Sequence, residues 1–248
     1  MYQFFVEDTQ VGKHTVTIEG SDVNHIKNVL RMKRGERVRI SSTSGKNYFG
    51  EIAAFAGETV LVALVEECAS DTELPSRISL FQGLPKSDKM ELIIQKAVEL
   101  GAYEIIPVAM KNCVVKLDEK KAAAKTARWQ EIAKSAAKQS KRSIIPKVGH
   151  LMSYQEALAA AAELDVVLVP YENARGMAAT REAMEAIVPG QSVGIFIGPE
   201  GGFADGEIAQ AREYDMRLIS LGGRILRTET AGLAALSVLM YHLEAGKE

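Results

Sequence analysis

The residues best suited to chemistry lie in two glycine-rich segments near the end of the chain, 198–203 (GPEGGF) and 221–231 (LGGRILRTETA). Each segment follows a short apolar run, 193–197 before the first and 217–221 before the second, and such runs are typical of buried parallel strands. We expect the two runs to be neighbouring strands of one sheet. Glycines at the carboxyl ends of neighbouring strands let a ligand approach bare backbone, so the sequence predicts one binding pocket there.

Neither glycine segment matches the common nucleotide-binding patterns. The chain has no G-x-x-x-x-G-K-[ST] sequence, and residues 198–202 do not form G-x-G-x-x-G. A Rossmann-type site would also open its domain at the first strand-to-helix turn, whereas these glycines come last. Either segment alone could simply make a tight turn, but the two together favour a pocket of another class.

The order of these elements, with these residues, resembles the SPOUT class of S-adenosylmethionine-dependent RNA methyltransferases, whose C-terminal segments form a deep trefoil knot. Within that class the chain is similar to the RsmE family over nearly its whole length. The similar segments are 25–32 (HIKNVLRM), 89–91, 94–101 (IQKAVELG), 139–142 (QSKR) and the two glycine segments. The resemblance implies an α/β fold: a PUA-like, RNA-binding β-barrel over residues 1–72 and a SPOUT methyltransferase domain with the knot over residues 73–248. Only the resemblance supports the knot, because knots are nearly absent from proteins.

The elements that must position the pocket change in pattern near residues 70–76. Before this point, short alternating runs at 37–40, 48–52 and 59–65 are separated by turns, as in a small β-barrel. After it, strands alternate with helices, which predicts a mostly parallel sheet with strands at 78–81, 103–108, 165–169, 193–197 and 217–221. One helix is expected to begin at Ser87 or Asp88 and to end at Gly101, with Met90, Ile93, Ala97 and Leu100 on one face.

The composition suits a soluble globular protein. The chain has 248 residues, of which 47% are hydrophobic, enough for one large domain or two smaller ones. It has no apolar run of about 18 residues and no signal-peptide pattern at its start, so we expect a cytoplasmic protein with no membrane partner. Cys68, Cys113 and the four histidines lack disulfide or metal-ligand spacing, so neither a disulfide framework nor a metal site is expected.

The positive charge is gathered in two clusters, at 27–39 and 120–147, although the net charge is −2. On a helix, Lys134, Lys138 and Lys141 would form one stripe. A charge run usually means only a solvated face, but the resemblance to RNA methyltransferases favours contacts to RNA phosphates. The residues expected to bind RNA are Lys27, Arg31, Lys33, Arg34, Lys134, Lys138, Lys141 and Arg142.

The resemblance implies that S-adenosylmethionine is held after three strands, with backbone amides of Gly201, Gly202, Ile225 and Leu226 at the adenine and ribose. The residues expected to bind this cofactor are Val169, Pro170, Tyr171, Glu172, Ile197, Gly198, Pro199, Gly201, Gly202, Leu221, Gly222, Arg224, Ile225, Leu226, Arg227, Thr230 and Ala231.

Methylation of N3 of a uracil requires a base for its proton and a partner for the negative charge that develops. Glu200 and Glu229 are the candidate bases, and Arg227 and Arg142 are the candidate charge stabilisers. Glu229 could equally cap the last helix or pair with Arg224 or Arg227.

The implied function is methylation of uracil N3 in 16S rRNA of the small ribosomal subunit, with the rRNA free or within the subunit. Two alternatives remain open: a SPOUT enzyme with another target, such as a ribose 2′-hydroxyl, and a catalytically silent RNA-binding protein. A homodimer is also expected, because segment 231–241 (AGLAALSVLMY) is apolar on nearly every side and must be covered on more than one.

Overall fold

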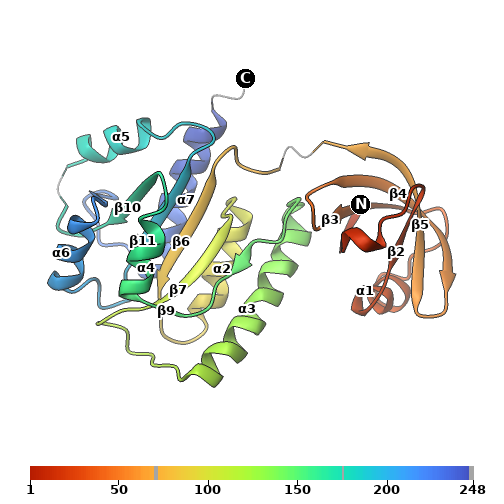
Figure 1. Ribbon diagram of the computed structural model, residues 1–248, viewed down its shortest axis with the longest axis horizontal. Helices are drawn as coiled ribbons and strands as arrows, with labels where there is room; N and C mark the ends of the chain where they lie inside the picture. Colours follow the sequence, from red (N-terminus) through yellow and green to blue (C-terminus); the bar gives the residue numbers. More distant parts are fainter. Residues whose placement is uncertain (70–71, 175, 246–248) are drawn as a thin grey trace. The chain divides into compact units, whose positions relative to one another are not determined.

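The computed structural model describes residues 1–69, 72–174 and 176–245, and the chain forms two compact units (Figure 1). Unit one contains Met1–Glu73 and Ala137–Ile145, and unit two contains Leu74–Ala136 and Pro146–Glu248. Ser70 and Asp71, where the sequence predicts the change of pattern to begin, lie outside the described residues. Unit one therefore contains the segment Ala137–Ile145, which lies far along the chain, and no local sequence pattern indicates this.

Unit one is built on a five-stranded mixed sheet in the order β1-β3-β4-β5-β2. Strand β1 runs parallel to β3, and the other pairs are antiparallel. In β3, Val38 and Ile40 are buried in the core, whereas Arg37 and Arg39 alternate with them, as the period of a strand requires. The elements are β1 (Tyr2–Val6), η1 (Asp8–Gln10), β2 (Thr15–Ile18), α1 (Ser21–Asn24), the π-helical turn η2 (His25–Val29), β3 (Arg37–Ser42), β4 (Asn47–Ala56) and β5 (Thr59–Cys68).

Polar contacts bind segment Ala137–Ile145 to the rest of unit one. Arg142 is only 3% exposed, and its Nε donates a hydrogen bond of 2.9 Å to Oε2 of Glu73. The Gln3 side-chain amide donates to the Arg142 carbonyl at 2.6 Å. Lys138 Nζ lies 2.6 Å from the nearer carboxylate oxygen of Asp22. These basic residues therefore help to hold the unit together.

Unit two is built on a parallel sheet in the order β12-β10-β11-β6-β7-β8, and β9 also pairs with β7. The expectation that 193–197 and 217–221 are neighbouring strands is wrong, because β10 lies between β11 and β12. An apolar run indicates that a strand is buried but does not identify its partners, and β11 already has β6 and β10 beside it. The strands are β6 (Arg77–Gly83), β7 (Glu104–Ala109), β8 (Lys147–Val148), β9 (Met152–Ser153), β10 (Val166–Pro170), β11 (Ser192–Ile197) and β12 (Arg217–Ile219).

Helices cover both faces of this sheet (Figure 1). On one face α7 packs against β6 and β11, where a side chain added at Gly232 would lie 3.5 Å from Ile197. On the other face the rings of Phe81 and Phe196 stack at 4.5 Å, and Tyr154 of α4 meets Phe196 edge-on. The helices are α2 (Lys89–Glu99), α3 (Glu119–Ser140), α4 (Tyr154–Ala161), α5 (Ala178–Glu185), α6 (Asp205–Glu213) and α7 (Thr228–Glu244). The helix expected after Asp88 is thus confirmed, and the left-handed Gly101 follows it.

None of the helices in the described part of the chain has the length and apolar character needed to cross a membrane.

Replacing Arg142 by Met should lower the free energy of unfolding of unit one by about 3 kcal/mol, because a mostly buried Glu73 carboxylate loses its partner. Arg37→Met is the matched control, since the Arg37–Glu51 pair is exposed and should contribute less than about 1 kcal/mol. Urea unfolding measures both variants. Equal losses would show that the Arg142–Glu73 pair has no special structural role.

Candidate functional site

A cavity of about 610 Å³ opens at the carboxyl ends of β10, β11 and β12. Open parallel sheets bind ligands at the carboxyl ends of their strands, and the cavity lies at that edge of this sheet. The walls come from the loops that follow these three strands and from Lys89 at the start of α2. The volume is that of an ordinary small-molecule site.

Most residues predicted to bind the cofactor line this cavity, namely Pro170, Tyr171, Glu172, Ile197, Gly198, Pro199, Gly202, Leu221, Gly222, Arg224, Ile225, Leu226, Arg227 and Ala231. Val169, Gly201 and Thr230 do not line it. Val169 is fully buried in β10, and Thr230 is exposed in the first turn of α7. At Gly201 a side chain would meet Asn112 Cβ at 3.0 Å, so Gly201 allows a close packing contact within the protein.

Other lining residues escaped the sequence reasoning: Lys89, Ala174, Gly176, Met177, Phe203 and Ser220. Gly223 and Thr228 also line the cavity and lie within the predicted segment 221–231. The similarity of segment 89–91 to the family was the available signal for Lys89, but its place at this cavity depends on the pairing of β6 with β11.

Hydrogen bonds fix the two glycine segments in place. Thr228 Oγ1 donates to the Gly198 carbonyl at 2.7 Å and accepts from the Gln82 side-chain amide at 2.8 Å. Gly202 and Gly222 have φ values of 66° and 104°, in the left-handed region that favours glycine. A side chain added at Gly223 would meet no atom within 4 Å, so this glycine leaves open space at the cavity wall.

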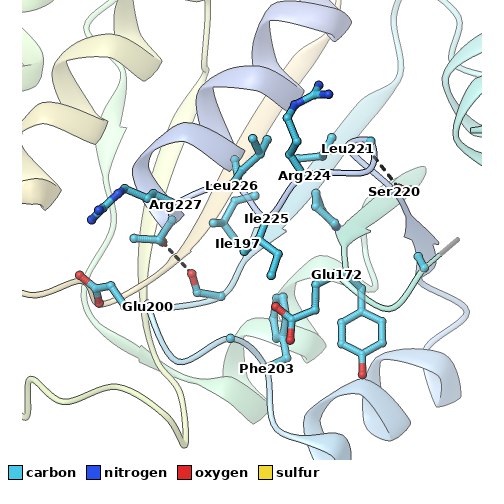
Figure 2. Close-up of a pocket in the computed structure, with 18 of the residues that line it drawn as sticks. Glu172, Ile197, Glu200, Phe203, Ser220, Leu221, Arg224, Ile225, Leu226 and Arg227 are labelled. Atoms are coloured by element: carbon cyan, nitrogen blue, oxygen red, sulfur yellow. Dashed lines mark hydrogen bonds between the residues drawn. The ribbon is translucent and has the colours of Figure 1, made fainter.

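The middle of the cavity is apolar and its sides carry charge (Figure 2). Figure 2 shows Ile197 and Leu226 near the centre, Glu200 to one side and Glu172 to the other, whereas the Arg224 guanidinium points away from these residues. Such an arrangement suits a ligand that combines a flat apolar ring with a cationic part.

Lys89 forms ion pairs with two glutamates at the Glu200 side of the cavity. Its Nζ lies 3.0 Å from Glu200 Oε1 and 3.2 Å from Glu229 Oε2. Glu200 and then Glu229 raise the pKa of Lys89 above its ordinary value, so the ammonium stays charged. Burial opposes ionisation of Glu200, but the Lys86 backbone N–H, which donates at 3.0 Å, and the Lys89 ammonium hold the pKa of Glu200 below its ordinary value.

The structure gathers only part of the predicted catalytic set. Glu200 and Arg227 line the cavity, whereas Glu229 pairs with Lys89 and does not line it. Arg142 belongs to unit one and is paired with Glu73. The catalytic roles of these four residues stay predictions.

The residues predicted to bind RNA differ in their accessibility. Arg31, Lys33 and Arg34 are exposed on unit one, and Lys134 is half-buried on α3. The other four have partners within the protein: Lys27 donates to the Gly57 carbonyl, Lys141 donates to the Met1 carbonyl at 2.9 Å, and Lys138 and Arg142 pair with Asp22 and Glu73. The predicted helical stripe of Lys134, Lys138 and Lys141 is wrong, because α3 ends at Ser140 and Lys141 has a left-handed φ of 64°. Lys138 and Lys141 are also held by Asp22 and by the Met1 carbonyl.

Comparisons with known proteins agree with this fold and site. Residues 72–240 match the family described as an RNA methyltransferase domain, and residues 18–64 match the RNA methyltransferase PUA domain. Within the described residues no group of histidine, cysteine, aspartate and glutamate side chains could hold a metal ion. The fold and the glycine-walled cavity thus define an RNA methyltransferase.

Relatives that match over nearly their whole length identify the family within this class. The Ribosomal RNA small subunit methyltransferase E of Bacillus subtilis (strain 168) is 40% identical over 98% of this chain and 98% of its own length. That of Mesomycoplasma hyopneumoniae (strain 232) is 34% identical over 96% of this chain and 98% of its own. A crystal structure of the enzyme from Neisseria gonorrhoeae, bound to S-adenosyl methionine, is 33% identical, with a TM-score of 0.84 over 97% of both chains. The chain belongs to the ribosomal RNA small subunit methyltransferase E family.

Membership of this family confirms the predicted resemblance and the predicted fold class, a PUA-like domain followed by a SPOUT methyltransferase domain. The trefoil knot stays a prediction.

Proposed function

We propose that this protein transfers a methyl group from S-adenosylmethionine to N3 of a uridine in 16S rRNA of the small ribosomal subunit. The observation that carries the proposal is the cavity between the two glycine segments, in a chain 33% identical to a protein solved with S-adenosyl methionine. The choice of uracil N3 rests on the resemblance of the residues to the RsmE family. Residues 1–72 would bind RNA and residues 73–248 would carry the transfer.

The cavity residues fit the proposed cofactor. The open space beside Gly223 leaves room for a ligand to approach the backbone, and Ile197 and Leu226 offer apolar contacts for an adenine ring. The Glu172 carboxylate suits the positive charge of the sulfonium or of the amino group. When bound, S-adenosylmethionine supplies a methyl group that is activated by the positive charge on sulfur. The chain's own task is to hold the acceptor nitrogen in line with that methyl group and to exclude competing water.

Unit one supplies the charge for RNA. The exposed Arg31, Lys33 and Arg34 have no ion pair within the described residues and suit RNA phosphates. Nearby in the same unit, Arg39 Nε and Nη2 are buried and have no hydrogen-bond partner in the part of the chain that the structure describes. Burial and then the Arg39 charge lower the pKa of Lys141.

Transfer to a ribose 2′-hydroxyl is the second candidate, since the same cofactor cavity could serve it. A catalytically silent RNA-binding protein is disfavoured, because the glycine segments and their supporting hydrogen bonds are intact.

The function is tested by incubating the purified chain with S-adenosylmethionine and small ribosomal subunits or free 16S rRNA from a strain lacking the modification. Mass spectrometry of the rRNA nucleosides should detect 3-methyluridine. Appearance of a 2′-O-methylated nucleoside would support the second candidate, and absence of any methylation would support the silent RNA-binding protein.

Gly223→Val should fill the open space at the cavity wall and weaken S-adenosylmethionine binding by about 100-fold in calorimetry. Gly206→Val is the matched control, because Gly206 also has open space but lies on α6 outside the cavity lining. Unchanged affinity in a folded Gly223→Val variant would contradict cofactor binding at this site.

Replacing Arg31, Lys33 and Arg34 together by Gln should weaken RNA binding. The slope of the logarithm of the binding constant against the logarithm of salt concentration should become less steep by about 2, because fewer counterions are released. Cofactor affinity should not change. The control replaces Lys120, Lys121 and Lys125 of α3 by Gln, which removes the same charge from unit two. Equal effects of the two triple variants would show non-specific attraction in place of a defined contact.

A homodimer is also proposed, because α7 packs its buried side on the sheet and still exposes Val238 and Tyr241, at 49% and 74%. Sedimentation at micromolar concentration should give twice the chain mass of 27.0 kDa, and Tyr241→Asp should shift the protein towards the monomer. Tyr214→Asp, at an exposed tyrosine after α6, should leave the dimer intact. A wild-type monomer would refute the dimer.

A further inference from the structure

We propose that Lys89 is the cation of the acceptor subsite: held between Glu200 and Glu229, its ammonium stabilises the negative charge on the acceptor ring, and Glu229 is a positioning residue that acts through it. This inference rests on the proposed methylation of uracil N3. It assigns a role to a residue that the glycine segments do not contain.

The first support is the position of Lys89. It lines the cavity with 27% of its side chain exposed, so its ammonium can reach a bound molecule. The two carboxylates that hold it come from separate elements, Glu200 from the loop after β11 and Glu229 from the first turn of α7. A charge fixed from two directions before the substrate arrives needs little reorganisation, which is what electrostatic stabilisation requires.

The second support is that Lys89 opposes the local rule for helices. It is the first residue of α2, where the helix dipole presents partial positive charge and favours acidic side chains. The preceding loop is also strained, because Ser87 has a φ of 56°. Helix stability therefore does not account for a lysine here, and departures from local rules tend to mark functional sites.

The two glutamates have the properties of groups that hold a cation. Glu200 accepts hydrogen bonds from the Lys86 backbone N–H and pairs with Lys89, and its lowered pKa makes it a weak acceptor for a proton. Glu229 does not line the cavity. Its Oε2 is buried and accepts no hydrogen bond of good geometry from a described residue, although Lys89 Nζ lies at an ion-pair distance of 3.2 Å. Glu229 therefore acts on the site through the Lys89 ammonium.

The other candidate cations are less well placed for this role. Arg142 is buried in unit one beside Glu73, and the Arg224 guanidinium points away from the other labelled cavity residues in Figure 2. Arg227 lines the cavity but is exposed at the N-cap of α7, and no ion pair of its side chain is recorded among the described residues. Lys89 is the cavity cation that the fold holds in one place.

Chemically, the ring N–H bond breaks, its proton passes to solvent, and its electron pair stays on the ring, where the carbonyl oxygens share the charge. The Lys89 ammonium stabilises this anion and so raises its population at neutral pH. The retained pair forms the new N–CH₃ bond, while the pair of the broken S–CH₃ bond stays on sulfur.

The test compares Lys89→Met, Lys89→Arg, Glu229→Gln and the double variant Lys89→Met/Glu229→Gln in the full-length protein, with 16S rRNA and S-adenosylmethionine. Lys89→Met should lower kcat by about 10²- to 10³-fold, the effect of removing one preorganised charge stabiliser. The KM for RNA and the calorimetric Kd for S-adenosylmethionine should stay within roughly threefold of wild type. Lys96→Met is the control on the same helix, because Lys96 pairs with Glu99 and does not line the cavity.

Glu229→Gln should lower kcat by about tenfold, and the double variant should lose no more than Lys89→Met alone, since a positioning residue has no effect without the group it positions. Additive losses would overturn the role of Glu229. If Lys89→Met does not fold, the test rests on Lys89→Arg and Glu229→Gln. Both substitutions displace or loosen the cation, so each should lower kcat by about tenfold while cofactor affinity stays unchanged.

A wild-type kcat in folded Lys89→Met, or in both conservative variants, would overturn the inference while the proposed function stands. Absence of 3-methyluridine with the wild-type protein would overturn the proposed function and the inference together. A parallel loss of cofactor affinity and kcat in Lys89→Met would show a structural role of the ion pairs and would also overturn the inference.

Discussion

The close approach of Gly83 to Pro199 is the constraint on which the site depends. A side chain at Gly83 would lie 2.7 Å from the Pro199 nitrogen, so only glycine allows the ends of β6 and β11 to come this near. The approach brings Glu200 to the Lys86 N–H and to the Lys89 ammonium. Thr228 then ties the start of α7 to the same place through Gly198 and Gln82. The cavity and its charged side are thus one consequence of how two neighbouring strands end.

The same chain uses basic residues for two different purposes. Arg142 and Lys138 are partly or wholly buried, and each has a carboxylate partner that offsets the cost of removing its charge from water. Arg31, Lys33 and Arg34 remain exposed and are free to meet phosphates. A run of positive charge in a sequence therefore combines buried residues that hold the fold with exposed residues that we propose to attract RNA.

The charged residues on the two sides of the cavity suit different parts of the reaction. A charge beside an apolar surface is screened less than a charge in bulk water. Glu172 on one side suits a cationic donor, and Lys89 on the other side suits an acceptor that becomes negative. The carboxylates of Glu200 and Glu229 keep the lysine charged. The roles proposed for Glu172 and Lys89 thus use opposite charges on the two sides of the cavity.

Local sequence determined much of this protein. The alternating runs before residue 70 and the apolar runs after it indicate the strands, Gly101 marks the end of α2, and the glycine segments locate most of the cavity wall. These features depend on period, burial and backbone freedom, which neighbouring residues express directly.

Only the tertiary structure decided which distant residues meet. The placing of β10 between β11 and β12, the inclusion of Ala137–Ile145 in unit one and the pairing of Lys89 with Glu200 and Glu229 all join segments far apart in the chain. Gly201 shows the same limit, since its close contact is with Asn112, which no local pattern indicates. The physical reason is that strand order and side-chain partners depend on packing energies summed over the whole fold, whereas propensity and periodicity record only the immediate surroundings of each residue.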